Sequence, residues 1–353
     1  MLKNLKHSIV FILIVITLLF VVVMSLAASK PVPNINTAVV SAQNGNESKY
    51  GKWSGLGMAL FDTGNTSEFD GDVDILLANG FTELRINIAD YQYTEALDYS
   101  KAAVIRAVAK GAKVIWGVCS GANTITAANW GAFRLAILDA AQWAQDNGVY
   151  EFQLGNEEEM QVDGTTMTVA QIITNLKSVA TDVQAIFTNG NVSYSCWQPS
   201  IDDWIKAGKG DIDILASNIY MGGEGYYGNE WKTSITNLVN AFGVDGTYLT
   251  EFNLSWSSLE DYSTDEAVQA AVLTEMIDYI KASGMTRALY FCWKYIWTYG
   301  EDYFGVVKND GTYRLLWNQA LLNTGTVEST TVPTKTTIAS LPGVIALIPR
   351  ITR

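Results

Sequence analysis

Two patterns of apolar and polar positions alternate along the chain from Trp53 onward. Short, nearly continuous apolar runs typical of buried strands begin near Leu56, Phe81, Ala112, Val149, Asn191, Ile212, Thr247 and Arg287. Between them, apolar residues recur three and four positions apart, which predicts helices that include Ala102–Ala109, Ala132–Ala144, Ala170–Ile186 and Ala267–Ile280. Glycines just before the next run predict helix C-terminal caps at Gly80, Gly111, Gly148, Gly190, Gly246 and Gly284.

This alternation predicts a parallel sheet covered by helices, because strands that are apolar on both faces must be buried on both. Eight strand–helix units in about 270 residues have the number and size of a TIM barrel. We therefore predict an α/β fold with one (β/α)8 domain over residues 51–323. The alternative is a doubly wound open sheet, which a glycine-rich turn after the first strand would favour, but Gly55 and Gly57 lie before or within that strand.

The two ends of the chain differ in composition from this domain. Residues 1–28 have a basic start, an apolar run over Ile9–Met24 and small residues before position 29, which predicts a secretory signal peptide. An uncleaved N-terminal membrane anchor is the second interpretation. Residues 29–50 are predicted to be a linker, and a closing helix is predicted over Leu315–Leu322. Residues 324–353 are a threonine-rich linker and an apolar tail too short to span a bilayer.

The charge, histidine content and cysteine content of the chain limit the kinds of catalysis and ligand binding that we expect. The net charge of −13 and the sequence pI of about 4.5 are unfavourable for binding nucleic acid. We expect a secreted protein that is a monomer. The single histidine, His7, lies outside the predicted domain, which excludes histidine-based catalysis and histidine metal sites within it. Cys119, Cys196 and Cys292 lie in apolar runs without CxxC spacing, so buried thiols are expected, with one disulfide as the alternative. No metal or organic cofactor is expected.

Two of the predicted strands end in a carboxylate at the start of a loop. Val149–Glu159 carries Asn156 followed by Glu157, and Thr247–Trp256 carries Glu251. In a (β/α)8 barrel the site lies at the C-terminal ends of the strands, where the fourth and seventh strands face each other across the ring. A facing pair of carboxyls suits glycoside hydrolysis, and retaining enzymes hold the pair about 5–5.5 Å apart.

Further residues at predicted strand ends complete an ordered set. Arg85 belongs to the second strand, Tyr220 to the sixth and Trp293 to the eighth, and Gly305–Asn318 forms a closing segment. Together with the two acids and the preceding asparagine, this set resembles the clan of retaining (β/α)8 glycoside hydrolases that includes cellulases, mannanases and β-glucosidases. The resemblance covers about residues 53–323.

The resemblance implies a role for each matching position. Glu157 would be the acid/base and Glu251 the nucleophile of a double displacement. Arg85 would steer the charge of the nucleophile, and Tyr220 would donate a hydrogen bond to it. Asn156 would contact the substrate 2-hydroxyl, and Trp293 would form the floor of the first subsite. Asn218 stands where several families of the clan have a histidine, and we include it among the substrate-binding residues.

Aromatic residues gather after the predicted strands, where their rings could stack on the apolar faces of sugars. The tryptophans assigned to this platform are Trp197, Trp256 and Trp297, and other rings in such positions are Tyr91, Tyr93, Tyr226, Tyr227, Trp231 and Tyr299. A row of rings favours a cleft and an endo-acting enzyme on a neutral polysaccharide. We predict a cellulase-like endo-β-1,4-glucanase first and a β-mannanase second, with β-1,3-glucanase and exo-β-glycosidase activity open.

Other interpretations of these residues stay open. Glu158 or Glu159 could be the acid in place of Glu157, or the three with Asp163 could hold calcium. Trp293 could be a core residue. Strand alternation should turn its neighbour Lys294 away from the barrel axis.

Two further alternatives concern the role of Arg85 and the functional class of the protein. Arg85 could be only a salt-bridge partner inside the barrel. A non-catalytic carbohydrate-binding or surface protein is the alternative from a different functional class, although such a protein would usually lose one of the two acids, and both are present.

Overall fold

The computed structural model describes residues 55–61, 65–86, 88–120, 125–161, 167–221, 230–254, 266–294, 304–308 and 310–317. The predicted signal segment, both linkers, the C-terminal tail and most of the predicted closing helix lie outside these residues. In the described ranges, no helix has the length and apolarity needed to cross a membrane.

A parallel sheet closed into a ring forms the centre of the fold. Its strands are β1 (Leu56–Leu60), β2 (Glu83–Ile86), β3 (Ala89–Asp90), β4 (Lys113–Cys119), β5 (Glu151–Asn156), β6 (Asn191–Trp197), β7 (Ile214–Met221), β8 (Leu249–Leu254) and β9 (Ala288–Tyr290). Neighbours follow the order β2-β1-β9-β8-β7-β6-β5-β4, and β2 also pairs with β4, which closes the ring of eight. The two-residue strand β3 pairs in parallel with the end of β4.

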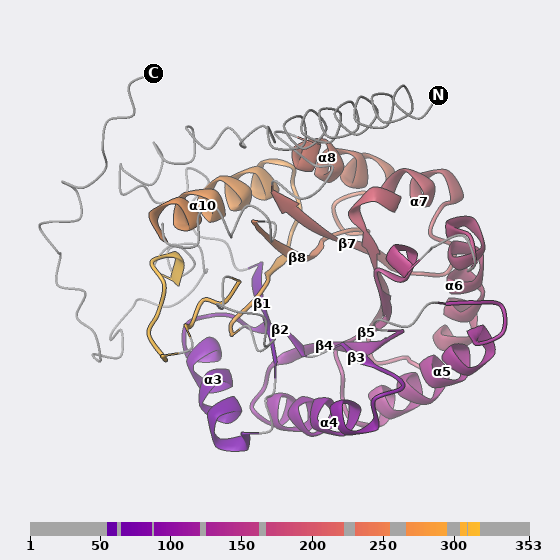
Figure 1. The fold of residues 1–353 in the computed structure, drawn as a ribbon, viewed down its shortest axis with the longest axis horizontal. Helices are drawn as coiled ribbons and strands as arrows, with labels where there is room; N and C mark the ends of the chain where they lie inside the picture. Colours follow the sequence, from indigo (N-terminus) through magenta and orange to yellow (C-terminus); the bar gives the residue numbers. More distant parts are fainter. Residues whose placement is uncertain are drawn as a thin grey trace, which may run out of the picture. The chain divides into compact units, whose positions relative to one another are not determined.

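Helices lie outside this ring, as Figure 1 shows in a view through the barrel. Those described are α3 (Thr66–Ala78), α4 (Thr94–Ala109), α5 (Trp130–Asp146), α6 (Val169–Gln184), α7 (Ile201–Ala207), α8 (Glu230–Phe242) and α10 (Glu266–Ala282). The helix α6 begins with a capping box, in which Thr168 accepts from the Gln171 N–H and the Gln171 side chain accepts from the Thr168 N–H.

The predicted (β/α)8 fold is confirmed. All eight predicted strands begin within two residues of the observed ones, as with Thr247 against Leu249 for β8. The four predicted helices fall on α4, α5, α6 and α10, although α4 begins at Thr94, well before the predicted residue 102. The additional strand β3 was not predicted, because two residues are too few to show a periodicity.

Two of the predicted glycine caps are wrong. The helix α8 ends at Phe242, and Gly243, with φ of 77°, follows it in place of Gly246. The helix α6 ends at Gln184, well before Gly190. Gly190 is required by close packing, because a Cβ there would lie 1.9 Å from the backbone oxygen of Tyr150.

The strands are buried on both faces, as the apolar runs indicate. All six residues of β8 are buried. Outside the ring, Trp116 of β4 packs on Trp143 of α5 with 4.8 Å between ring centroids. Inside the ring, a separate apolar cluster comprises Ile115, Ile214, Ala216, Tyr248 and Leu289. The core of the barrel is therefore filled by side chains.

Polar groups close the end of the barrel where the strands begin. The fully buried carboxylate of Glu151 pairs with Arg287 and accepts a hydrogen bond of 2.6 Å from the Tyr248 hydroxyl. The guanidinium of Arg287 also lies over the Tyr248 ring and pairs with Glu83 at 3.3 Å. This network satisfies buried polar groups at the end of the barrel opposite to the predicted site.

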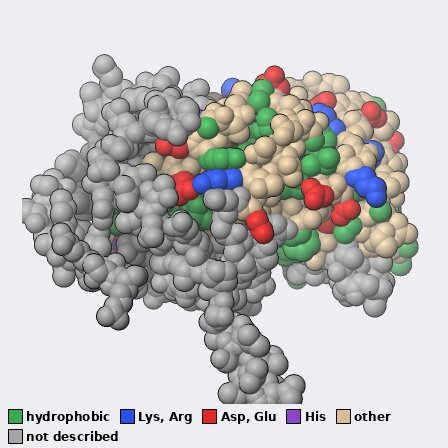
Figure 2. Space-filling model, turned by 90° about the horizontal axis from the view of Figure 1, so that it is seen from above, with side chains coloured by type: hydrophobic (Ala, Val, Ile, Leu, Met, Phe, Trp, Pro, Cys, Tyr) green, Lys and Arg blue, Asp and Glu red, His purple; other side chains and the backbone are tan. Residues whose placement is uncertain are grey.

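The cysteines and the surface complete this description. Cys119, Cys196 and Cys292 are each buried and no disulfide links them, in agreement with the preferred interpretation of buried thiols. On the face shown in Figure 2, acidic, basic and hydrophobic side chains of the described residues are interspersed, without one field of a single charge.

Candidate active site

Glu251 lies in β8 and is held by two donors from other strands. The Nη1 atom of Arg85 lies 2.6 Å from its Oε1 atom, and the Tyr220 hydroxyl donates to its Oε2 atom. Arg85 and Glu251 are only 5% and 7% exposed. A buried carboxyl that faces a guanidinium and a phenol is stabilised in its ionised form. The predicted association of these three residues is therefore present.

Arg85 uses the rest of its guanidinium to order the end of β5. Its Nε atom donates to Oε1 of Gln153 at 2.9 Å, and its Nη2 atom donates to Oδ1 of Asn156 at 2.7 Å. One side chain from β2 thus fixes residues of β5 and β8. Gln153 was not predicted, although a buried amide in the middle of an apolar strand is a signal that could have drawn attention to it.

Asn156 and Asn218 continue this network. Because Arg85 can only donate, the amide oxygen of Asn156 must face it, and the same oxygen accepts from Nδ2 of Asn218 at 3.1 Å. The Asn218 oxygen accepts from the Ser195 and Thr250 hydroxyls at 2.8 Å each. Asn218 is 1% exposed, so its observed contacts orient Asn156, and direct contact of Asn218 with substrate stays a prediction.

Glu157 follows β5 directly and is half-buried. Its backbone has a positive φ of 58°, which is uncommon for a residue with a Cβ, and its N–H donates to the Ser195 carbonyl at 2.9 Å. Burial raises the pKa of Glu157 to about 8, and the negative charge of Glu251 adds to the rise. Hydrogen bonding by Asn218 and the charge of Arg85 act in the opposite direction.

Glu158 and Glu159 are buried and turned toward protein donors. The Glu158 carboxylate accepts from the Asn156 N–H at 3.2 Å and from both the N–H and the hydroxyl of Ser120. Glu159 accepts from the Tyr194 hydroxyl at 2.8 Å and from the Trp204 indole. Neither carboxyl is exposed enough to meet a substrate, which favours Glu157 as the acid among the three.

Only some residues of the predicted aromatic platform lie within the part of the chain that the structure describes. Trp197 ends β6 and is half-buried, while Trp256 and Trp297 lie outside the described residues. Trp293 is 0% exposed, and its ring centroid lies 5.1 Å from that of Trp317. A ring without an exposed face offers no surface to a sugar, so the structure corrects the predicted subsite floor and places Trp293 in the core.

Phe291 is the aromatic residue near the end of β9 that approaches the site. Its side chain is half-buried, and its ring centroid lies 6.4 Å from that of Tyr220. Sequence analysis missed it because β9 ends at Tyr290, so the period of two cannot place the residues that follow. Lys294 turns away as predicted, with its Nζ atom 2.8 Å from Asp72 of α3.

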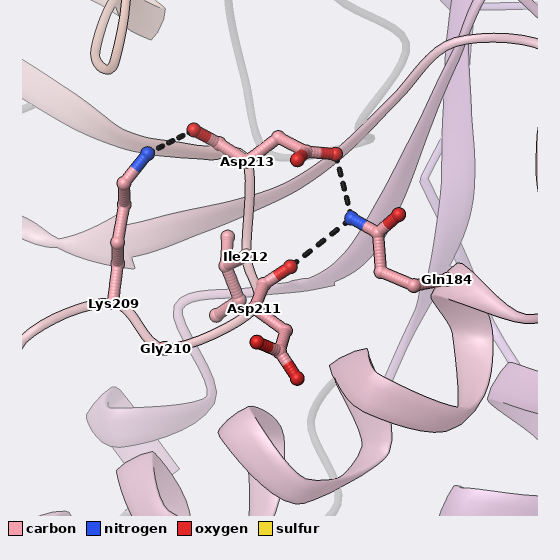
Figure 3. A pocket seen from close by; sticks show the side chains of 6 residues that line it. All are labelled: Gln184, Lys209, Gly210, Asp211, Ile212 and Asp213. Atoms are coloured by element: carbon pink, nitrogen blue, oxygen red, sulfur yellow. Dashed lines mark hydrogen bonds between the residues drawn. The ribbon is translucent and has the colours of Figure 1, made fainter.

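A concavity of about 460 Å³ lies elsewhere on the barrel (Figure 3). Gln184 at the end of α6 and residues 209–213 before β7 line it, and Gln184 donates to Asp213 at 2.7 Å. This position is near the N-terminal ends of the strands, opposite to Glu157 and Glu251. Gln184 also donates to the Asp211 carbonyl at 3.1 Å, and Lys209 donates to the Asp213 carbonyl. Because the concavity lies at the other end of the barrel, it is not part of the candidate site.

The candidate site combines two carboxyls of different character. One, Glu157, holds its proton near neutral pH, because its pKa is raised to about 8, and the other, Glu251, pairs with the Arg85 guanidinium and accepts from the Tyr220 hydroxyl. Such a pair can protonate a leaving group from one side and supply a negative charge from the other. Within the described residues, no group of three or more His, Cys, Asp or Glu could hold a metal, and Asp163 of the calcium alternative lies outside them.

Comparisons with known proteins bear on the fold. No protein-family model matches the chain, and no characterised protein matches its sequence. An exo-β-1,4-mannosidase from Opitutaceae bacterium strain TAV5 is similar in structure, with a TM-score of 0.57 and 14% identity over 78% of this chain and 61% of the mannosidase.

Two further solved structures are similar in the same way. A β-glucuronidase from Parabacteroides merdae has a TM-score of 0.56 and 11% identity over 78% of this chain and 38% of its own. A GH113 β-1,4-mannanase has a TM-score of 0.53 and 14% identity over 72% of this chain and 94% of its own. At such identities the likeness shows the fold alone: the chain forms a (β/α)8 barrel of the kind found in these glycosidases.

Proposed function

We propose that the protein is a retaining β-glycosidase. Glu157 donates a proton to the glycosidic oxygen, and Glu251 attacks the anomeric carbon to form a covalent glycosyl intermediate. Glu157, now ionised, then removes a proton from the water that hydrolyses this intermediate. The proposal assigns no step to a metal or an organic cofactor.

The observation that carries this proposal is the pair of opposed environments at one end of the barrel. Burial and a neighbouring negative charge keep a proton on Glu157, with its pKa raised to about 8. Arg85 and Tyr220 hold a negative charge on Glu251. A retaining glycosidase needs these two protonation states at the same time, one for the acid and one for the nucleophile.

For the substrate we propose a neutral β-1,4-linked polysaccharide, with β-mannan and β-1,4-glucan as the two candidates. The structural likeness to proteins named as a β-1,4-mannanase and an exo-β-1,4-mannosidase supports β-mannan. The aromatic side chains after the strands favour an extended chain of either sugar, and they favour endo action. We keep β-1,4-glucan because the described residues include no contact that distinguishes the 2-hydroxyl configurations.

A glucuronide is disfavoured by the charges at the site. The guanidinium nitrogens of Arg85 are engaged with Gln153, Glu251 and Asn156. Lys294 is paired with Glu68 and Asp72 of α3. Among the described residues, neither cation is available to a carboxylate on the sugar.

Product analysis tests the activity and its stereochemistry together. Mannan, carboxymethyl-cellulose, lichenan and laminarin are incubated in parallel, and proton NMR follows the anomeric signal of the first product from a reduced oligosaccharide of the best substrate. We expect a β-anomer first and a rapid fall in viscosity for the preferred polymer. An α-anomer as the first product would contradict the retaining mechanism, and release of monosaccharide at constant viscosity would contradict endo action.

Binding without hydrolysis of any of these polymers would favour the non-catalytic alternative. We also propose that the enzyme is secreted and acts as a monomer. Cell fractionation and size-exclusion chromatography check these two points.

A further inference from the structure

Two buried hydroxyls to which the proposed reaction assigns no role lie next to the candidate site. They belong to Ser195 of β6 and Thr250 of β8, and both side chains are fully buried. Each hydroxyl oxygen lies 2.8 Å from the Oδ1 atom of Asn218, and the two hydroxyls also contact each other. Among the described residues, neither hydroxyl has another hydrogen-bond partner.

The donors and acceptors around Asn218 determine how its amide is turned. Because Arg85 can only donate, the atom of Asn156 that lies 2.7 Å from its Nη2 atom is the amide oxygen. The Asn218 atom that lies 3.1 Å from this same oxygen must be a donor, so it is Nδ2. The Asn218 oxygen therefore faces the two hydroxyls, and it can bond to them only if they donate.

The number of hydrogens indicates that either hydroxyl can serve. Ser195 and Thr250 have two hydroxyl hydrogens for three contacts. Two hydroxyls that contact each other share one hydrogen between them at most, so the second hydrogen is free to reach the Asn218 oxygen. Loss of one hydroxyl leaves the other as a donor, whereas loss of both leaves a buried oxygen without a donor.

This arrangement decides what Asn156 offers to a substrate. Its oxygen already accepts from Arg85 and from Asn218, which uses both lone pairs. Asn156 is half-buried, and its Nδ2 atom has no hydrogen-bond partner among the described residues. The free group of Asn156 is therefore a donor, held in place by the two bonds to its oxygen.

We propose that Ser195 and Thr250 are positioning residues that act through the Asn218 amide to hold Asn156 as a hydrogen-bond donor to the substrate. The inference rests on the proposed function and on the contact of Asn156 with the substrate 2-hydroxyl. Without either hydroxyl, the Asn218 amide is no longer held with its nitrogen toward Asn156. If that amide turns over, its oxygen faces the Asn156 oxygen and repels it.

The test compares two substrates in the full-length protein. An aryl β-glycoside of the preferred sugar and its 2-deoxy analogue are assayed with S195A, T250V and S195A/T250V. The measured quantity is the ratio of kcat/KM for the two substrates, because only the first can accept from Asn156. A loss of stability or of folded protein lowers both values of kcat/KM and leaves their ratio unchanged.

We expect the ratio to fall roughly tenfold in S195A/T250V and less than about threefold in each single variant. S195A/T250S keeps one hydroxyl and should restore the ratio. The matched control is S193A, because Ser193 lies two positions before Ser195 on the same strand and its buried hydroxyl has no hydrogen-bond partner. S193A should leave the ratio at the wild-type value.

A second comparison covers the case in which S195A/T250V does not fold. N218L removes the amide and leaves Ser195 and Thr250 to bond to each other, and N218L/S195A/T250V makes the same region wholly apolar. If the hydroxyls act through Asn218, both proteins should show the same lowered ratio. A lower ratio in the triple variant than in N218L would overturn the inference.

A wild-type ratio in S195A/T250V would also overturn the inference, as would no recovery in S195A/T250S or an equal fall in S193A. Side-chain amide exchange is followed by NMR in the same proteins, with N218D to identify the Asn218 signal. This amide should exchange faster in S195A/T250V than in wild type. A wild-type protein that hydrolyses no β-glycoside would contradict the proposed function, while the exchange rates would still test the action of the two hydroxyls on Asn218.

Discussion

The Nη1 atom of Arg85 lies 2.6 Å from the Oε1 atom of Glu251, although the two residues are 166 positions apart in the chain. Both are almost fully buried. A buried ion pair of this kind contributes little to stability compared with apolar residues of the same size, because both charges lose their hydration. Its retention at the end of the barrel is therefore better explained by a need for an ionised Glu251 than by folding.

Replacing Arg85 should damage both the site and the fold. In R85M the Glu251 carboxylate is left without its cation, and we expect kcat to fall by at least roughly a hundredfold. The free energy of unfolding should fall by about 3–5 kcal/mol, because an unpaired charge is left buried. R85K is the control, since it keeps the charge but loses the bonds to Gln153 and Asn156. An R85K variant as impaired as R85M would show that geometry matters more than charge.

Tyr220 offers a sharper comparison, because the barrel contains a similar bond at its other end. Y220F removes the hydroxyl that donates to Glu251, and we expect kcat to fall roughly 10- to 150-fold, as for hydrogen bonds to charged groups. Y248F removes the hydroxyl that donates to Glu151 and should lower stability while kcat is unchanged. Steady-state kinetics and urea unfolding of both variants are the measurements. Similar kinetic losses in both would contradict the assignment of the site.

The raised pKa of Glu157 predicts how stability changes with pH. The group binds a proton in the folded protein up to about pH 8 but releases it near 4.5 when unfolded. Folding therefore takes up a proton between these values, and the stabilising effect of the protonated form is lost as pH rises through this window. We expect the free energy of unfolding of E157Q to exceed that of wild type increasingly from about pH 4.5 to about pH 8. A constant difference would contradict the raised pKa.

Glu158 should act through the backbone of its neighbour. Its carboxylate accepts from the Asn156 N–H and from Ser120, while its own N–H donates to Tyr194. These bonds hold the chain on both sides of Glu157, whose positive φ costs about 1–2 kcal/mol. E158A should lower both kcat and the free energy of unfolding. E158Q keeps an acceptor and should retain most of both, and a loss as large as in E158A would indicate that the charge itself is needed.

Substitutions of Trp197 and Trp293 test which aromatic rings contact the sugar. W197A should raise KM roughly 2- to 10-fold with little change in kcat, because a half-buried ring at the end of β6 can stack on substrate. W293F should lower stability and leave KM unchanged, since Trp293 packs against Trp317 in the core. A higher KM in W293F would restore the platform role predicted from the sequence.

The sequence could predict the strands, whose apolar pattern repeats along the chain, and the residues that lie at the strand ends. The eight strands follow from their apolar runs, and the association of Arg85, Tyr220 and Glu251 follows from their places at strand ends. The positions of Glu158 and Glu159 could not be predicted in this way. Acidic residues in a loop are usually exposed, and the side-chain donors that hold these two are 35 to 45 residues distant in the chain.

The error at Trp293 has a similar origin. Alternation along a strand gives the side of a residue only while the chain remains extended, and β9 ends three residues before Trp293. Beyond that point, packing against Trp317 decides where the ring lies.

Chemical rescue tests the roles of the two acids most directly. E251G and E157A are assayed with an activated aryl β-glycoside in the presence and absence of azide, and the configuration of the product is determined by NMR. The proposed mechanism predicts that azide restores activity to E251G with an α-glycosyl azide as product, because azide then attacks in place of the nucleophile. It predicts a β-glycosyl azide from E157A, because azide then attacks the covalent intermediate. Equal and modest losses in both variants, or the same product configuration from both, would contradict the assignment of Glu251 as nucleophile and Glu157 as acid/base.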